Sequence, residues 1–199
     1  MYGLPYPSAA TRIKQLAEAC QVLKQLWTQP RSNFDGAYYQ LRDALCEPKP
    51  VQQPYPRLVL GGEGERFMLR VVVEHADEWN YSAMLPAFKA FYASSIEGGP
   101  AVTSPSAAPA AALIAAYKHT LAALDSHLAA VGREPHTLRR SVQLVATEPW
   151  ADLVSTVCNF IALGADHLIF HPGLRAYDAS QLATLWGNVI PAIRDRVGR

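Results

Sequence analysis

The sequence has few cysteines, almost no excess of charge and no long hydrophobic run, and each absence excludes a class of protein. The three cysteines, Cys20, Cys46 and Cys158, are far apart and form no C-x-x-C motif, so neither a disulfide framework nor a thiolate zinc site is expected. Eighteen lysines and arginines against seventeen aspartates and glutamates leave a net charge of +1, which argues against nucleic acid or an anionic membrane as a partner. No stretch is apolar enough to span a bilayer, and the N-terminus does not resemble a signal peptide. A soluble, cytoplasmic protein is the expectation.

Several catalytic motifs are also missing. No G-K-[ST] follows the glycines near residue 61, and Phe67 occupies the place of the third glycine of a dinucleotide fingerprint. No G-x-S-x-G or H-E-x-x-H motif supports a hydrolase. His167 and His171 fall on a predicted strand, where they would lie ~13 Å apart, too far to share one ion. We therefore predict no metal site. His119 and His127 fall on a predicted helix surface and are expected to be solvated.

The residues that are present alternate between helical and extended patterns. Apolar residues recur at helical spacing from Ala9 to Trp27, with Ser8 placed to cap the first turn. Further helices are predicted over residues 64–75, 115–131, 150–161 and from Asp178 onward with a kink at Pro191, and strands over residues 58–60, 78–81, 141–147 and 167–170. Residues 28–57 read as irregular, and residues 94–112, rich in alanine, serine and proline, as a flexible loop.

Regular alternation predicts parallel strands joined by right-handed crossovers, and therefore a single α/β domain over residues 1–199. Four strands are about half of what a closed (β/α)8 barrel requires. From the pattern alone, the chain is therefore expected to be about half of a larger fold.

The seam between the first of these strands and its helix carries Gly61, Gly62 and Gly64. The first N–H groups of a helix lack partners within it and carry partial positive charge. Glycines there allow an anion to approach the backbone closely, and Arg66 could add a forked donor to a phosphate. The same residues also suit a plain turn. From this pattern alone, both interpretations stay open.

Several separated stretches, taken together, carry more information than the glycines. They are "YGLPYPSAATRIKQLAEACQVLKQLW", "FDGAYYQL", "KPVQQPYPRLVLGGEGERFMLRVVVEHADEWN", "GREPHTLRRS", "GADHLIFHPG" and "LWGNVIPAI". In this order they resemble the bacterial luciferase-like monooxygenase family, most closely its branch of oxidoreductases that depend on the deazaflavin coenzyme F420.

The resemblance implies a cofactor at the C-terminal ends of the strands, either F420 or, as the alternative, flavin mononucleotide (FMN). It implies hydride transfer or oxygen activation on a small organic substrate, with no catalytic residue assigned. The backbone of Gly61, Gly62, Glu63 and Gly64 would hold the cofactor phosphate, with Arg66 as a helper. Residues expected to face cofactor or substrate are Trp79, Asn80, Tyr81, Phe170 and His171.

The resemblance implies a (β/α)8 TIM barrel. The family pattern begins before the first match in this chain, so we expect the C-terminal half of that barrel, a domain truncated at its N-terminus that lacks part of the pocket. The alternative is a non-catalytic half-barrel that pairs with itself or with a complementary half-barrel, because open sheet edges favour pairing. A misplaced start, with a longer real protein, is a further interpretation.

Overall fold

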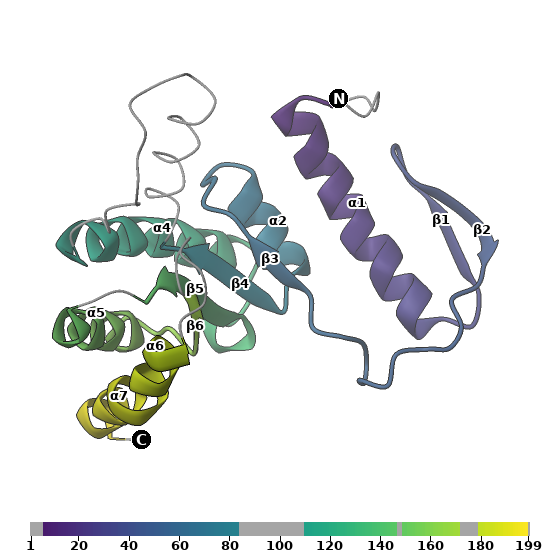
Figure 1. The fold of residues 1–199 in the computed structure, drawn as a ribbon. Coiled ribbons are helices and arrows are strands. Elements are labelled where there is room, and N and C mark those ends of the chain that lie inside the picture. The colour runs from purple at the N-terminus through teal and green to yellow at the C-terminus, as the bar shows by residue number, and fades with distance from the viewer. Residues whose placement is uncertain (1–5, 84–109, 147–148, 172–178, 199) are drawn as a thin grey trace. The chain divides into compact units, whose positions relative to one another are not determined.

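The computed structural model describes residues 6–83, 110–146, 149–171 and 179–198 (Figure 1). The chain forms two compact units. Unit 1 comprises Met1–Trp79 and Ala123–Leu138, and unit 2 comprises Asn80–Ala122 and Arg139–Arg199. Most of the predicted loop over residues 94–112, and the predicted cap at Asp178, lie outside the described residues.

The strands and helices follow the predicted α/β order. Strands β3 (Val59–Gly61), β4 (Glu78–Ser82), β5 (Arg139–Val145) and β6 (His167–His171) form a sheet in the order β3-β4-β5-β6. The helices between and after them are α2 (Met68–His75), α4 (Ala110–Ala130), α5 (Trp150–Ala162), α6 (Ala179–Thr184) and α7 (Ile190–Val197). An α/β fold with a parallel sheet and flanking helices is thus confirmed, and the half-barrel stays a prediction consistent with it.

Unit 1 begins with the predicted amphipathic helix, α1 (Ala9–Thr28). The hydroxyl of Ser8 accepts the N–H of Thr11 at 3.2 Å, which satisfies one of the unpaired donors at the helix start. Cys20 is buried on the apolar side of the helix. Both the helix and its capping residue are therefore as the sequence indicates.

The expectation of irregular structure over residues 28–57 is wrong for part of that region. Strands β1 (Ser32–Asp35) and β2 (Gln40–Ala44) form an antiparallel hairpin. The carboxylate of Glu18, on α1, accepts the N–H groups of Ala37, Tyr38 and Tyr39, three of the four residues of the turn, at 2.8–3.1 Å. A side chain from a different element thus holds the turn, which explains why local patterns do not reveal the hairpin.

Helix α2 supplies apolar residues to the interior of unit 1, with Leu69, Val72 and Val73 almost fully buried. Its C-terminal end is capped by Arg133, whose Nη1 donates to the carbonyls of Val73 and Ala76 at 2.9 Å each. Burial lowers the pKa of Arg133, although Asp77 and Tyr55 act to raise it. The arginine takes the place of the missing helical donors at this end.

Unit 2 contains the parallel pair β5–β6, with Ser141 opposite His167 and Val145 opposite His171. Three aromatic rings pack edge to face in its interior. Tyr81 and Phe160 each contact Tyr117, with ring centroids 5.0 and 5.1 Å apart. Helix α4 begins at Ala110, ahead of the predicted Ala115.

The final predicted helix is divided into three pieces. The π-helical turn η2 (Leu185–Val189) joins α6 to α7, and the N–H of Ile190 bonds the carbonyl of Leu185. Pro191 follows at the start of α7, where the lack of an N–H costs little. The sequence predicts a kink at Pro191, and the structure has an irregularity there in the form of the π-helical turn η2 just before the proline.

Candidate functional site

The glycine turn, defined here as residues 61–67, connects β3 to α2. Gly61 ends β3, and α2 begins at Met68 rather than at the predicted Gly64. Among the described residues, no side chain caps the N-terminal end of this helix. Instead, the carbonyl of Gly64 accepts the N–H groups of Met68 and Leu69 at 2.9 and 3.1 Å. Because those two donors are already used, an anion at this end must be bound by N–H groups earlier in the turn.

Gly62 occupies a backbone conformation that requires glycine. Its φ is +136°, and a Cβ added there would lie 2.7 Å from Cγ of Met68. The carbonyl of Gly62 accepts the indole N–H of Trp79 at 2.9 Å. Trp79 has no exposed surface, so it lies beneath the turn and supports it. The resemblance assigns Trp79 only a ligand-facing role and does not reveal this support.

His127, on α4, contacts the same turn from another element. Its Nε2 lies 2.7 Å from the carbonyl oxygen of Glu65. His127 lies on the helix surface, as expected, and there it is half-buried and has a protein partner. The histidine is far from the turn in the sequence, so helix periodicity could identify its exposed face but not its partner.

These contacts fix the direction of the peptide groups in the turn. In a trans peptide the C=O of one residue and the N–H of the next point in opposite directions. The carbonyls of Gly62, Gly64 and Glu65 are directed at protein donors. The N–H groups of the following residues consequently point away from those donors, as a backbone site for an anion requires.

The remaining polar side chains of the turn differ in their surroundings. Arg66 is exposed, and its guanidinium carbon lies 5.1 Å from the ring centroid of Phe67. Glu63 is half-buried. A carboxylate repels a phosphate at close range, so the backbone of Glu63, rather than its side chain, suits an anion.

The other predicted site residues belong to unit 2. The amide of Asn80 donates to the hydroxyl of Ser141 at 3.0 Å. Tyr81 is 3% exposed and packs against Tyr117. Phe170 and His171 are consecutive on β6, so their side chains point to opposite faces of the sheet.

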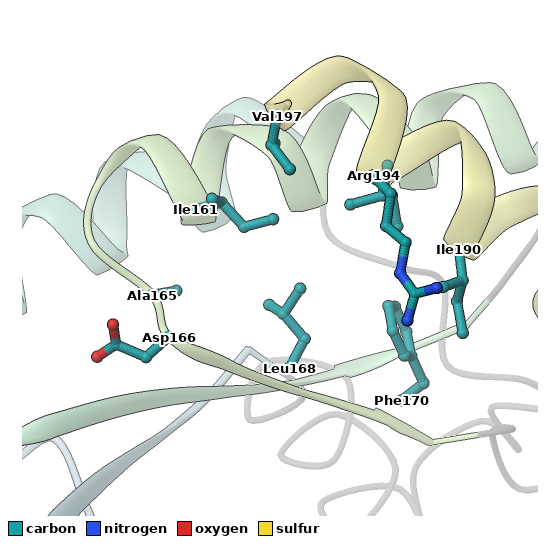
Figure 2. Close-up of a pocket in the computed structure, with 9 residues that line it drawn as sticks. Ile161, Ala165, Asp166, Leu168, Phe170, Ile190, Arg194 and Val197 are labelled. Atoms are coloured by element: carbon teal, nitrogen blue, oxygen red, sulfur yellow. The ribbon is translucent and has the colours of Figure 1, made fainter. Parts of the chain in front are cut away.

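Phe170 lines a cavity of about 350 Å³ between β6 and the helices α5 and α7 (Figure 2). Leu168 and the apolar residues of the two helices form most of its wall, and the guanidinium of Arg194 points toward Phe170. No residue of the glycine turn lines this cavity. Phe170 therefore points to the helix-covered side of β6.

Two kinds of feature are absent from the part of the chain that the structure describes. No group of three or more histidine, cysteine, aspartate or glutamate side chains within it is arranged to hold a metal ion. Within the same ranges, no helix combines the length and apolar character needed to cross a membrane.

Comparison with known families identifies the chain. The model of the luciferase-like monooxygenase family matches residues 1–149. The chain belongs to this family. The luciferase-like chain is 40% identical over 60 residues to an F420-dependent glucose-6-phosphate dehydrogenase of Kineococcus radiotolerans, which covers 30% of the chain and 18% of that relative. It is 29% identical over 80 residues to an FMNH(2)-dependent dimethylsulfone monooxygenase of Pseudomonas putida, covering 40% of the chain and 22% of the relative.

The matches thus span less than a quarter of the length of these curated relatives. A solved structure of an F420-dependent secondary alcohol dehydrogenase, in complex with an F420–acetone adduct, resembles the chain with a TM-score of 0.65. The likeness covers 96% of this chain and 64% of that one at 15% identity. At this identity the likeness shows the fold alone.

Proposed function

We propose that the luciferase-like chain is part of an oxidoreductase that binds coenzyme F420, with FMN as the alternative cofactor, and acts on a small organic substrate. Family membership and relatives named for each cofactor support the class. The observation that carries the proposal is the glycine turn, with its carbonyls held by protein donors. Both cofactors carry a phosphate ester, which such a turn suits.

The residues of the turn fit a phosphate. Gly61 and Gly64 are exposed and present no side chain, and Gly62 could not carry one without displacing Met68. The backbone N–H groups over residues 62–66 would hold the phosphate, and the exposed guanidinium of Arg66 would add a charge-assisted donor. When bound, the cofactor supplies the hydride or oxygen chemistry, while the protein binds and orients it.

Of the five residues predicted to face cofactor or substrate, we retain two in the proposal. Trp79 supports the turn from below, Tyr81 is part of an aromatic core, and Phe170 faces α5 and α7. Asn80 and His171 remain, both half-buried. Asn80 is oriented by Ser141, and His171 ends β6, as a residue at the mouth of a barrel strand would.

Titration of the purified chain with F420 and with FMN tests the proposal. We expect saturable binding of one of them, weakened about 10-fold or more by Arg66→Ala, because a hydrogen bond to a charged group contributes ~1.5–3 kcal/mol. Arg70→Ala is the matched control, since Arg70 is also exposed but is paired with Glu74 at 2.9 Å. Absence of binding by both cofactors would contradict the proposal, and equal losses in the two variants would remove Arg66 from it.

We also propose that the protein is cytoplasmic and that β6 pairs with a second copy of the chain or with a complementary half-barrel. Strand β6 ends the sheet order, and all of its residues are partly exposed, whereas β5 buries Ser141, Val142 and Leu144. An edge strand with accessible apolar residues favours association. Light scattering on the eluted protein should show a dimer, and a monomer at every concentration tested would refute self-pairing.

A further inference from the structure

We infer that His127 is a positioning residue for the phosphate-binding turn, an inference that rests on the proposed function. It acts through the peptide that links Glu65 to Arg66. The contact is made by Nε2 of His127, 2.7 Å from the carbonyl oxygen of Glu65. The histidine lies on α4, in the segment Ala123–Leu138 that belongs to unit 1 together with the turn.

The direction of the hydrogen bond follows from its partners. A carbonyl oxygen can only accept, so Nε2 of His127 must carry the proton. With the carbonyl of Glu65 directed at His127, the N–H on the other side of the same peptide, that of Arg66, is directed away from it. His127 therefore selects the peptide orientation in which the Arg66 N–H is available to an anion.

Two donors from different elements hold the two parts of the turn. The indole of Trp79 holds the carbonyl of Gly62, and the imidazole of His127 holds that of Glu65. Trp79 is fully buried, so its ring also packs in the interior of the protein. His127 lies on a helix surface, where core packing does not require a histidine. The contact with the Glu65 carbonyl is therefore the role that we assign to His127.

Loss of the His127 contact has two consequences for an anion. The peptide between Glu65 and Arg66 can rotate, which withdraws the Arg66 N–H from the phosphate. The same rotation turns the carbonyl oxygen of Glu65 toward the phosphate, and the two negative ends repel each other. We expect the affinity for the phosphate-bearing cofactor to fall about 10- to 100-fold, in the range measured for charge-assisted hydrogen bonds.

The test compares two pairs of ligands that differ in phosphate: FMN with riboflavin, and F420 with its phosphate-free riboside. The wild-type chain should prefer the phosphate-bearing member of at least one pair. His127→Phe should remove most of that preference and leave the affinity for the phosphate-free member unchanged. His127→Gln, which retains an N–H donor, should restore part of it. His119→Phe, an exposed position on the same helix, is the control and should change neither affinity.

The outcomes separate the two proposals. A wild-type chain that binds none of the four ligands overturns the proposed function. A wild-type chain that prefers the phosphate-bearing ligand, with the same preference in His127→Phe, overturns only the inference about His127. If His127→Phe does not fold, nitrogen NMR of the wild-type histidines decides. A protonated Nε2 in His127 whose resonance shifts on addition of the phosphate-bearing ligand supports the inference, and an unprotonated Nε2 or an unmoved resonance refutes it.

Discussion

Replacement of Gly62 by alanine tests whether the turn depends on a residue without Cβ. The φ of +136° is one that L side chains rarely adopt, and backbone strain of this kind costs ~1–3 kcal/mol. The new Cβ would also lie 2.7 Å from Cγ of Met68. Because that side chain is flexible it can move, at an additional ~1 kcal/mol for local overpacking. We therefore expect the free energy of unfolding to fall by about 2–4 kcal/mol.

Urea unfolding followed by far-UV circular dichroism measures this change. Gly132→Ala is the reference, since Gly132 has a φ of +65° and an added Cβ would meet no neighbouring atom within 4 Å. This variant should lose only ~1–2 kcal/mol for the left-handed backbone. A double-mutant cycle with Met68→Ala separates strain from contact, because only the contact couples the two positions. A Gly62→Ala variant no less stable than Gly132→Ala would refute the reasoning.

Three further predictions concern the contacts around unit 1. Arg133→Lys removes a guanidinium whose Nη1 serves two carbonyls at the end of α2 and whose Nη2 serves the carbonyl of Thr137. A single ammonium cannot reach both places, so the free energy of unfolding in urea should fall by ~1–3 kcal/mol, because a carbonyl loses its donor. Trp79→Phe keeps the apolar ring but removes the donor to Gly62; thermal melting should show a loss of ~1–3 kcal/mol, with no change for Trp186→Phe, a position 67% exposed. Burial acts to raise the pKa of Glu18, but the three backbone N–H groups that it accepts lower the pKa by more, so that it lies below its ordinary value of 4.5. The stability that Glu18 contributes is present above pH 4.5 and lost as the pH falls through its lowered pKa, so melting curves of Glu18→Gln should depend less on pH in that acidic window.

The elements that local patterns determine were predictable from the sequence. Helix α1 has both an apolar stripe and a capping residue, Ser8, and the structure shows both. Strand β4 was predictable to within one residue of its observed end at Ser82. In these cases the information lies within the element itself, since side-chain period and helix capping act over a few residues.

Features that depend on distant residues were not predictable. The turn of the hairpin β1–β2 is bonded by Glu18 from α1, and the glycine turn is contacted by His127 from α4. Nothing in the local pattern around either turn identifies those partners. The prediction that both Phe170 and His171 face the ligand could have been corrected from the sequence alone, because strand periodicity places consecutive side chains on opposite faces of the sheet.

Unit 1 is assembled from two stretches of chain, and this has a consequence during synthesis. The donors that hold the Glu65 carbonyl and the end of α2, His127 and Arg133, both come from its second stretch, Ala123–Leu138. On the ribosome, β3 and α2 emerge well before these residues are translated. Until then the carbonyl of Glu65 and the C-terminal end of α2 have no donor from His127 or Arg133. We therefore expect the first stretch to become fully ordered only after the second stretch has been synthesised.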